Sequence, residues 1–374
     1  MTIYEKLGVR TCINGRATLT SHGGSVMPPE VLRAMVESAD AFVDLMELQR
    51  KVGERIASLT KNEGAYVCAG ASAGLFITAA ACMAGMDPDK RNRLPDAKGM
   101  NNEIIVHVHG ELGYPYIINL TGATIVQPGS HEKTTPDDME SAITSRTAAI
   151  YYMAYGPPDT YERPGILPLR TCIDIAHKHG LPLIVDAAAQ IPPASNLWAY
   201  THYGADLAMF SGGKGLCGPQ STGLIVGRKG MIEACIFNGY LGGRIARPMK
   251  VCKEEMIGLL VAIELYLSRN ADDEDLQRYE HRVAYMAEAF SAIPHLTSKL
   301  TAPTDVGKPY SSIEVILDEN ALGITAQELV KKLLTGTPSI AVNGGKNSMS
   351  INPQTLGDGE ECIIVRRVKE ILTA

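Results

Sequence analysis

The chain has 374 residues, 45% apolar and 20% charged, which is ordinary for a globular protein with one large domain and a smaller one. Its formal net charge of −6 argues against a nucleic-acid-binding surface, because phosphate binding requires a basic patch. No apolar run is long enough to cross a membrane, and the first ten residues lack a signal-peptide pattern. The eight cysteines contain no C-x-x-C pair, so we expect reduced thiols in a cytoplasmic protein.

Apolar runs alternate with amphipathic segments through the middle of the chain, a pattern that predicts a mainly parallel sheet covered by helices. The expected strands are Ala65–Cys68, Glu103–His107, Thr124–Val126, Ala148–Met153, Leu181–Asp186, Leu207–Ser211 and Gly223–Val226. The expected helices between them are Pro136–Thr144, Leu169–His179 and a short one near Leu197–Tyr203. Gly85–Asn102 is poor in apolar residues and is predicted to be a surface loop.

The pattern changes after Pro248, where Lys250–Ser268 carries apolar residues at the spacing of a long helix. Beyond it, helices and strands of a small α/β domain are expected near Leu276–Ile293, Ser311–Leu317, Thr325–Leu334, Met349–Ile351 and Gly359–Leu372. We therefore expect three parts. Residues 1–50 form an N-terminal arm and a helix packing with the small domain, residues 51–248 the large domain, and residues 249–374 the linking helix and the small domain.

Lys214 lies within Ser211-Gly212-Gly213-Lys214-Gly215, directly after an apolar strand. The carboxyl end of a buried strand is where open α/β sheets bind ligands, and glycines allow close approach to the backbone. A desolvated lysine there favours its neutral, nucleophilic form, which suits a Schiff base. The alternative is a solvated lysine in a surface turn.

Asp186 ends the apolar run Leu181–Asp186. Pyridoxal 5′-phosphate (PLP) requires a carboxylate beside its pyridine nitrogen to keep that nitrogen protonated. The alternative is an aspartate that caps a helix or a turn. Only a short helix and one further strand separate Asp186 from Lys214, so both should emerge at the same edge of the sheet.

Small residues fill Ala69-Gly70-Ala71-Ser72-Ala73-Gly74, between a strand and an Ala-rich helix. A helix N-terminus of this kind offers free N–H groups to a phosphate, although tight strand–helix packing requires the same residues. A possible phosphate-binding turn, an acid at a strand end and a lysine after a strand end follow one another along this chain. PLP needs all three, so PLP is the expected cofactor, with no metal.

The residues of these segments, and the order in which the segments occur, resemble those of the fold-type-I PLP enzymes, which have the aspartate-aminotransferase-like fold. Within them the chain is similar to the branch around bacterial L-seryl-tRNA(Sec) selenium transferase, and in particular to the D-glucosaminate-6-phosphate ammonia-lyase group. The resemblance runs from Ile13-Asn14-Gly15 to the C-terminal domain. Its specific parts are residues 68–74, Thr147-Ala148-Ala149-Ile150, residues 183–189, Phe210-Ser211-Gly212-Gly213-Lys214 and Met249-Lys250-Val251-Cys252-Lys253-Glu254.

The resemblance implies a mainly parallel seven-stranded sheet with a smaller C-terminal α/β domain. It also implies a homodimer or larger assembly with the active site at the subunit boundary. Lys214 would carry the cofactor, and Asp186 would face the pyridine nitrogen. The residues assigned to the phosphate are Gly70, Ala71, Ser72 and Ser211.

Other candidate site residues each have a second interpretation. His109 lies where this fold stacks a ring on the cofactor, and its imidazole would also be a catalytic proton shuttle. Tyr114 is the second choice for the stacking position. His107 and His109 share one face of an extended segment and would suit a metal pair, but no third ligand is indicated nearby. Gln190 either bonds to the cofactor or the substrate, or closes the loop before Pro192.

Arg244 and Arg247 lie in a Gly-rich stretch before the long helix, where a guanidinium can clamp a carboxylate or phosphate. We expect Arg247 to contact the cofactor and Arg244 the substrate, while surface ion pairs remain the alternative for both. His22 lies in Ser21-His22-Gly23-Gly24-Ser25, which resembles a loop that covers the substrate in the family.

The expected activity is that of a PLP-dependent carbon–nitrogen lyase acting on a hydroxylated amino acid or amino sugar acid. Lys214 would remove the α-proton, the β-substituent would leave, and hydrolysis of the imine would give a 2-oxo acid and ammonia. Racemisation and retro-aldol cleavage start from the same carbanion and stay open. Selenium transfer on seryl-tRNA is less favoured, because the chain is acidic and lacks an extra N-terminal tRNA-contacting domain. A non-catalytic regulator would need a DNA-binding domain, for which the sequence leaves no room.

Two departures from the family bear on the substrate. Ammonia-lyase members carry an acidic residue at about Gln190, and an amide cannot act as a general acid, so protonation of the leaving group must come from another residue. The selenium transferase has an arginine near Gln354, and its absence here shifts carboxylate binding to Arg244 or Arg247.

Overall fold

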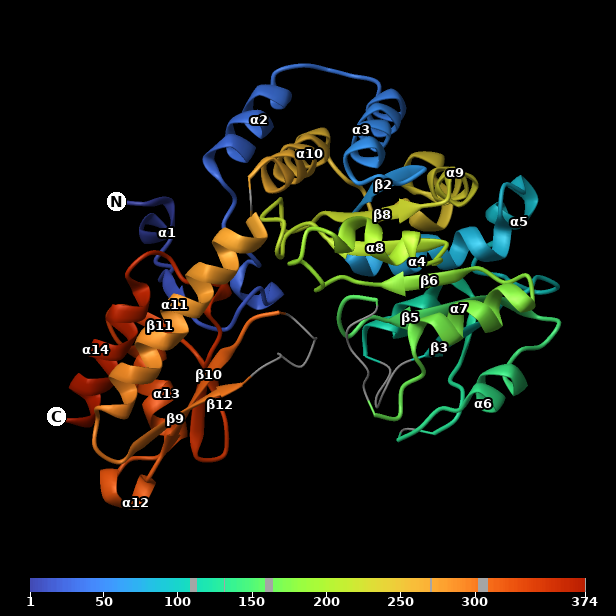
Figure 1. The fold of residues 1–374 in the computed structure, drawn as a ribbon. Coiled ribbons are helices and arrows are strands. Elements are labelled where there is room, and N and C mark those ends of the chain that lie inside the picture. Colours follow the sequence, from blue (N-terminus) through green and yellow to red (C-terminus); the bar gives the residue numbers. More distant parts are fainter. Residues whose placement is uncertain (108–112, 131, 159–163, 270, 302–308, 374) are drawn as a thin grey trace. The chain divides into compact units, whose positions relative to one another are not determined.

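The computed structural model describes residues 1–107, 113–130, 132–158, 164–269, 271–301 and 309–373 (Figure 1). The chain forms two compact units: a larger unit, Met27–Arg269, and a smaller unit, Met1–Val26 with Asn270–Ala374. Residues 27–50 and 249–269 thus belong to the larger unit, whereas the sequence had assigned them to parts associated with the small domain. The reason is helix packing, because α10 (Lys253–Ser268) contacts both α2 (Pro29–Ala39) and α3 (Leu45–Leu59).

A seven-stranded sheet forms the centre of the larger unit, in the order β2-β8-β7-β6-β5-β3-β4. Its strands are β2 (Gly64–Cys68), β3 (Glu103–His107), β4 (Thr124–Val126), β5 (Thr147–Met153), β6 (Leu183–Asp186), β7 (Leu207–Ser211) and β8 (Gly223–Gly227). The five strands from β7 to β4 are parallel to one another, while β8 runs antiparallel to both β7 and β2. The seven predicted strands are therefore all present, and the mainly parallel sheet is confirmed.

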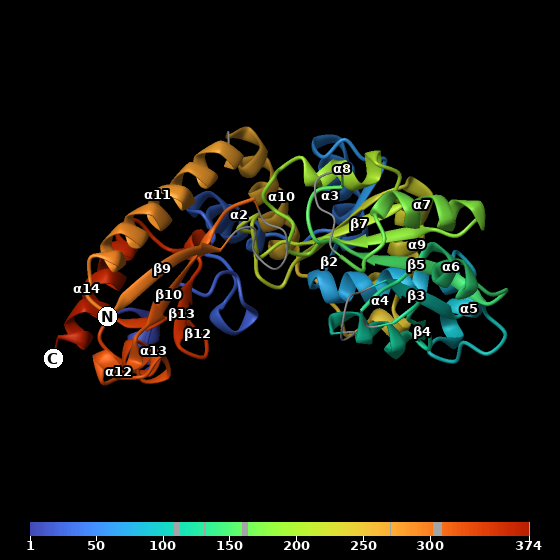
Figure 2. The same cartoon turned by 60° about the horizontal axis from the view of Figure 1, so that its bottom comes forward.

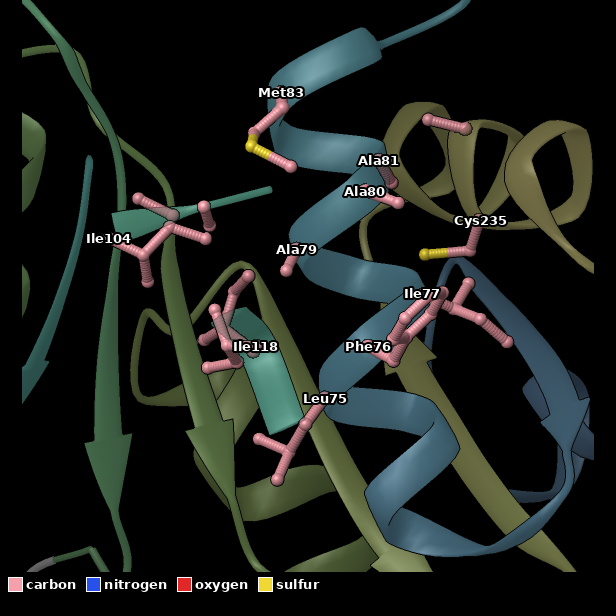
Figure 3. Packing of buried hydrophobic residues seen from close by; sticks show 14 of the residues in the cluster. Leu75, Phe76, Ile77, Ala79, Ala80, Ala81, Met83, Ile104, Ile118 and Cys235 are labelled. Atoms are coloured by element: carbon pink, nitrogen blue, oxygen red, sulfur yellow. The ribbon is translucent and has the colours of Figure 1, made fainter. Parts of the chain in front are cut away.

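Helices cover both faces of this sheet (Figure 2). Helix α4 (Gly70–Ala84) packs on one face, and Figure 3 shows it between Ile104 and Ile118 on one side and Cys235 of α9 (Lys229–Asn238) on the other. Its alanines from Ala73 onward are almost completely buried, which lets the helix backbone approach the strands closely. Helices α7 (Leu169–Lys178) and α8 (Asn196–His202) contact the strands from the opposite face.

The remaining helices of the larger unit include one in the segment Gly85–Asn102, which the sequence had predicted to be a loop. There α5 (Pro88–Arg93) begins at Asp87, whose side chain accepts hydrogen bonds from two backbone N–H groups of the first turn. Helix α6 (Pro136–Ser141) is capped by Thr135 and is shorter than predicted. The 3-10 helices are η2 (Tyr114–Thr121), η3 (Tyr240–Gly242) and η4 (Arg244–Ala246).

The smaller unit has its own core beneath two sheets. One sheet pairs β1 (Cys12–Asn14) with β11 (Ser339–Ala341), and the other has the order β12-β13-β10-β9. The strands of the latter are β9 (Leu296–Thr301), β10 (Ser312–Leu317), β12 (Asn343–Gly344) and β13 (Ser348–Ile351). The helices of this unit are α1 (Ile3–Lys6), η1 (Thr20–His22), α11 (Ala271–Ser291), α12 (Glu319–Leu322), α13 (Ala326–Thr335), η5 (Pro353–Thr355) and α14 (Glu360–Leu372). The predicted small α/β domain is thus present.

Candidate active site

The candidate site lies at the carboxyl edge of the parallel strands, on the face that α4 covers. Asp186 ends β6 and pairs with Met209 of β7. The Sδ atom of Met209 lies 3.4 Å from where a Cβ on Gly74 of α4 would be, so Met209 faces α4. Paired residues of neighbouring strands share a face, so the carboxylate of Asp186 also lies on the α4 side.

Asp186 is a buried carboxylate whose negative charge receives few stabilising contacts from the protein. Its side chain is 7% exposed, and its Oδ1 accepts a hydrogen bond of 3.0 Å from the N–H of Ala188. Burial raises the pKa of Asp186, while the Ala188 hydrogen bond and the charge of Lys214 oppose that rise. A cationic or protonated group placed beside this carboxylate would therefore be held strongly.

Lys214 provides the complementary group. It is half-buried, and burial lowers the pKa of its amine, while attraction to Asp186 opposes the lowering. Each residue thus acts electrostatically on the other, so the structure brings the two strand-end residues into one site. An amine with a lowered pKa is neutral more often at physiological pH and can attack an aldehyde.

The glycines around Lys214 were expected to let a ligand approach the backbone, but the structure gives a different reason for them. A Cβ on Gly212 would lie 2.0 Å from Oγ1 of Thr222, and a Cβ on Gly213 would lie 2.3 Å from the Cα of Gln220. A Cβ on Gly215 would lie 2.2 Å from the carbonyl oxygen of Ile191. These glycines are required because the lysine loop is packed against its own chain, which fixes the backbone that carries the amine.

We expect Gly215→Ala to destabilise the protein by about 1–3 kcal/mol, because backbone must move to admit the methyl group. Thermal unfolding of the purified variant measures this loss. Gly230→Ala is the matched control: a Cβ there meets no atom within 4 Å, so its unfolding temperature should stay near that of the wild type. Equal unfolding temperatures for the two variants would contradict the tight packing of the lysine loop.

The N-terminus of α4 lies beside the end of β7. Ser211 pairs with Gly223 of β8, and a Cβ on Gly223 would lie 2.4 Å from the carbonyl carbon of Gly70 and 2.7 Å from the nitrogen of Ala71. The residue before the helix, Ala69, makes no side-chain cap, so the first N–H groups keep their capacity to bind an anion. The structure therefore brings Ser211 together with the first turn of α4, where Ser72 is half-buried.

Two residues of this arrangement were not identified from the sequence, Ala188 and Gly223. Ala188 donates the backbone hydrogen bond to Asp186, and Gly223 lets β8 pack against the start of α4. A glycine at the first position of a predicted strand is a signal of close backbone approach and could have identified Gly223.

Gln190 is 2% exposed and holds the loop that follows β6. Its side-chain Nε2 donates to the backbone carbonyl oxygen of Ala154 at 3.0 Å, and its backbone carbonyl oxygen accepts from Nδ2 of Asn196 at 2.6 Å. These bonds support the loop-closing alternative considered for this residue.

The other candidates lie in varied surroundings. Tyr114 begins η2 and is 76% exposed, and Arg244 and Arg247 are exposed in and after η4. Arg244 adopts a φ of +64°, an uncommon conformation for a residue with a side chain. His22 is half-buried in the smaller unit, with its Nδ1 3.1 Å from Oγ of Ser21. His109 lies outside the described residues.

Gln354, the position of the expected missing arginine, also belongs to the smaller unit. Its Oε1 accepts a hydrogen bond of 2.9 Å from the hydroxyl of Tyr310. This amide therefore takes part in a polar contact of that unit and carries no charge for a carboxylate.

His107 faces away from Asp186. Its partner in β5 is Tyr152, whereas the neighbouring Tyr151 points to α4 and lies 2.6 Å from Oγ1 of Thr78. The side chain of His107 is 1% exposed, and its Nε2 accepts a hydrogen bond of 2.9 Å from the N–H of Leu167. Among the described residues no group of three His, Cys, Asp or Glu side chains could hold a metal ion.

The neutral state of His107 should make the fold sensitive to acid. Burial lowers the pKa of His107 to about 4, and the neutral ring is the form whose Nε2 can accept the N–H of Leu167. The folded pKa lies below the unfolded one, so the stability that this group contributes is complete above pH ~6.5 and is lost as the pH falls towards 4. Between pH 7 and pH 5 the wild type should lose about 2 kcal/mol more than His107→Gln, measured by urea unfolding at both pH values.

His281→Gln, a change at an exposed position of α11, should keep the wild-type pH dependence. If His107→Gln lost as much stability on acidification as the wild type, the neutral buried state of His107 would be wrong.

Comparisons with known proteins place the chain among characterised relatives. The family model described as L-seryl-tRNA selenium transferase matches residues 13–302. The chain is 35% identical to 5'-C-glycyluridine monooxygenase-decarboxylase from a Streptomyces species, over 99% of this chain and 92% of that protein. It is 34% identical to D-glucosaminate-6-phosphate ammonia lyase from Salmonella typhimurium, over 99% of this chain and 97% of that protein.

Solved structures agree with these matches. A structure of D-glucosaminate-6-phosphate ammonia-lyase has a TM-score of 0.86 and 33% identity, covering 100% of this chain and 98% of that one. At 15% identity, a ureidoglycine-glyoxylate aminotransferase from Bacillus subtilis has a TM-score of 0.61, covering 98% of this chain and 93% of that one. The aspartate-aminotransferase-like fold predicted from the sequence is therefore confirmed. No helix in the described ranges has the length and apolar character needed to cross a membrane.

Proposed function

Because the chain belongs to the L-seryl-tRNA selenium transferase family, we propose that it is a PLP-dependent carbon–nitrogen lyase acting on an amino sugar acid or another hydroxylated amino acid. The observation that carries the proposal is the pair of buried Asp186 and half-buried Lys214, together with the uncapped first turn of α4. An acid, an amine and an anion site are the three groups that PLP requires.

Each residue of the site would contact a different part of the cofactor. Asp186 would hold the ring nitrogen in its protonated form, and Lys214 would bond to the aldehyde carbon. The phosphate would lie on the first turn of α4 and Ser211, with Gly70, Ala71 and Ser72 around it. Arg247 and His109 remain proposed cofactor contacts.

When bound, PLP supplies an electron-accepting ring that stabilises negative charge at the α-carbon of an amino acid. Lys214 would move the proton between that carbon and its own amine nitrogen, for which its lowered pKa suits it. Gln190 can orient a group but cannot give a proton to the departing β-substituent. We propose that His22, Tyr114 and Arg244 contact the substrate.

The proposed setting is a cytoplasmic homodimer or larger homo-oligomer that binds a small amino acid and neither nucleic acid nor a membrane. Static light scattering of the purified protein measures the assembly directly.

A direct assay tests the reaction. The purified enzyme with added PLP is incubated with D-glucosaminate 6-phosphate, D-serine or L-serine, and both ammonia and 2-oxo acid are measured. Equal amounts of the two products are expected from at least one substrate. Loss of optical rotation without ammonia would indicate a racemase, and release of an aldehyde would indicate a retro-aldolase. A mobility shift with seryl-tRNA at physiological salt would favour the transferase.

A second candidate is an oxidative decarboxylation, because the chain is as similar to the Streptomyces monooxygenase-decarboxylase as to the ammonia lyase. Oxygen uptake with release of carbon dioxide from 5'-C-glycyluridine, in place of ammonia from D-glucosaminate 6-phosphate, would select it over the lyase.

A further inference from the structure

The loop that carries Lys214 is closed on itself by backbone hydrogen bonds. The N–H of Gly212 donates to the carbonyl oxygen of Thr222 at 2.8 Å, and the carbonyl oxygen of Gly212 accepts from the N–H of Gly218 at 2.8 Å. Within the loop, the N–H of Cys217 donates to the carbonyl oxygen of Lys214 at 3.0 Å. The backbone two residues before Lys214 is therefore held at both of its polar groups.

A tight turn over residues 219–222 lies against this loop. The N–H and the side-chain Oγ1 of Thr222 both donate to the carbonyl oxygen of Pro219, at 2.9 and 2.6 Å. Thr222 is fully buried, so no water can replace either donor. The hydroxyl of Thr222 thus closes the turn a second time, in addition to the backbone.

The turn packs on the two residues that lead into Lys214. Oγ1 of Thr222 lies 2.0 Å from where a Cβ on Gly212 would be, and the Cα of Gln220 lies 2.3 Å from where a Cβ on Gly213 would be. The turn and the lysine loop are therefore in direct contact, and a displacement of the turn has to move the loop.

The same segment also contacts the start of α4. The carbonyl oxygen of Ser221 lies 3.8 Å from where a Cβ on Gly70 would be. Gly223, the next residue after the turn, packs against the backbone of Gly70, because a Cβ on Gly223 would lie 2.4 Å from the carbonyl carbon of Gly70. One short segment thus lies against both the lysine loop and the turn that is proposed to bind the phosphate.

We propose that Thr222 is a positioning residue whose hydroxyl sets the place of the Lys214 amine relative to the first turn of α4. It acts through the backbone of Gly212 and Gly213. The inference rests on the proposed function and deepens it, since PLP would bond to Lys214 at one end and lie on α4 with its phosphate at the other.

Thr222→Val replaces the hydroxyl by a methyl group of similar size. A carbon atom requires about 3.3 Å from a carbonyl oxygen, whereas Oγ1 of Thr222 lies 2.6 Å from that of Pro219. The methyl group must therefore move by several tenths of an ångström, and the turn or the lysine loop must move with it. Thr222→Ser keeps the hydroxyl and avoids this conflict.

Formation of the yellow colour after PLP is added to the cofactor-free protein is the first measurement. Thr222→Val should form the colour about 10-fold more slowly than the wild type. Its kcat should fall by about 10- to 100-fold with a much smaller change in KM, because displacement of the amine by a fraction of an ångström affects the reacting atoms most. Thr222→Ser should restore both quantities to near the wild-type values.

Thr60→Val is the matched control. Thr60 is also fully buried, and its Oγ1 donates to the carbonyl oxygen of Ile56 at 2.8 Å, at the end of α3. This variant should lower the unfolding temperature, as Thr222→Val does, and keep the wild-type rate of colour formation and the wild-type kcat. Equal slowing in the two variants, or equal losses in Thr222→Val and Thr222→Ser, would overturn the proposal.

A measurement without the cofactor separates this proposal from the proposed function. In the cofactor-free protein, the labelling of Lys214 by acetic anhydride is followed against pH by peptide mass spectrometry. Burial lowers the pKa of the Lys214 amine, so a displaced loop should move the midpoint upward in Thr222→Val and leave it unchanged in Thr60→Val.

The labelling profile decides whatever the assay of turnover gives. If the wild type bound no PLP or turned over none of the substrates, the proposed function would fail, and a raised midpoint in Thr222→Val would still support the positioning role. A wild-type midpoint in that variant would overturn it. If Thr222→Val failed to fold, the pair Thr222→Ser and Thr222→Ala, which differ only in the hydroxyl, would decide by the same measurements.

Discussion

Lys214→Ala should abolish the yellow colour of the PLP-loaded protein and lower kcat by about 10³-fold or more. The amine of Lys214 is both the proposed covalent link and the proposed proton carrier, so one substitution removes two roles. The fold should persist, since removal of a half-buried amine also removes a desolvation cost. Visible absorption and ammonia release in single-turnover experiments measure the two effects.

Borohydride reduction can identify the nitrogen atom to which the cofactor is bonded. Reduction of the wild type, followed by peptide mass spectrometry, should find the cofactor on the peptide that contains Lys214 and on no other. Lys51→Ala, at an exposed lysine of α3 that pairs with Glu54, should behave like the wild type. A coloured, active Lys214→Ala protein would refute the site.

Asp186→Asn should separate catalysis from stability. The amide keeps an oxygen for the N–H of Ala188 but lacks the charge, so we expect kcat to fall by about 10²- to 10³-fold and the affinity for PLP to weaken. The cofactor-free protein should unfold at an equal or higher temperature than the wild type, because burial makes the ionised carboxylate unfavourable. The raised folded pKa means that this difference exists at neutral pH and disappears as the pH falls below the usual range of Asp.

The matched control is another buried aspartate, Asp206, which immediately precedes β7. Its carboxylate lies 2.7 Å from Nη1 of Arg228 and 3.0 Å from Nε2 of His177, and it accepts the N–H of Leu183 at 2.8 Å. Asp206→Asn should therefore lower the unfolding temperature while leaving cofactor binding and kcat near the wild-type values. If Asp186→Asn lost stability and kept its activity, Asp186 would be a structural acid of the same kind as Asp206.

The sheet could be predicted because its strands are buried on both faces and appear in the sequence as apolar runs bounded by turns. Strand β9 was missed, because most of its residues are exposed at an edge and carry no such run. Helix α5 was missed although Asp87 and Pro88 are a typical helix start, because its remaining residues are all polar, most of them charged, and resemble a loop.

The site was predictable where it depends on strand order alone. Asp186 and Lys214 follow neighbouring strands of a parallel sheet, so their proximity follows from topology. The reason for the glycines around Lys214 was not predictable, since it depends on contacts with Ile191, Gln220 and Thr222 that only the folded chain makes.

The single antiparallel strand has a consequence for the order of assembly during synthesis. β2, which leads into the first turn of α4, is an edge strand whose one partner in the sheet is β8, and β8 is the last of the seven strands to leave the ribosome. Contacts between such distant segments form late, since loop closure must precede them. The proposed phosphate-binding turn should therefore remain unformed in any nascent chain that ends before residue 227. Limited proteolysis of stalled ribosomal chains should find residues 64–72 cleavable until that length is passed.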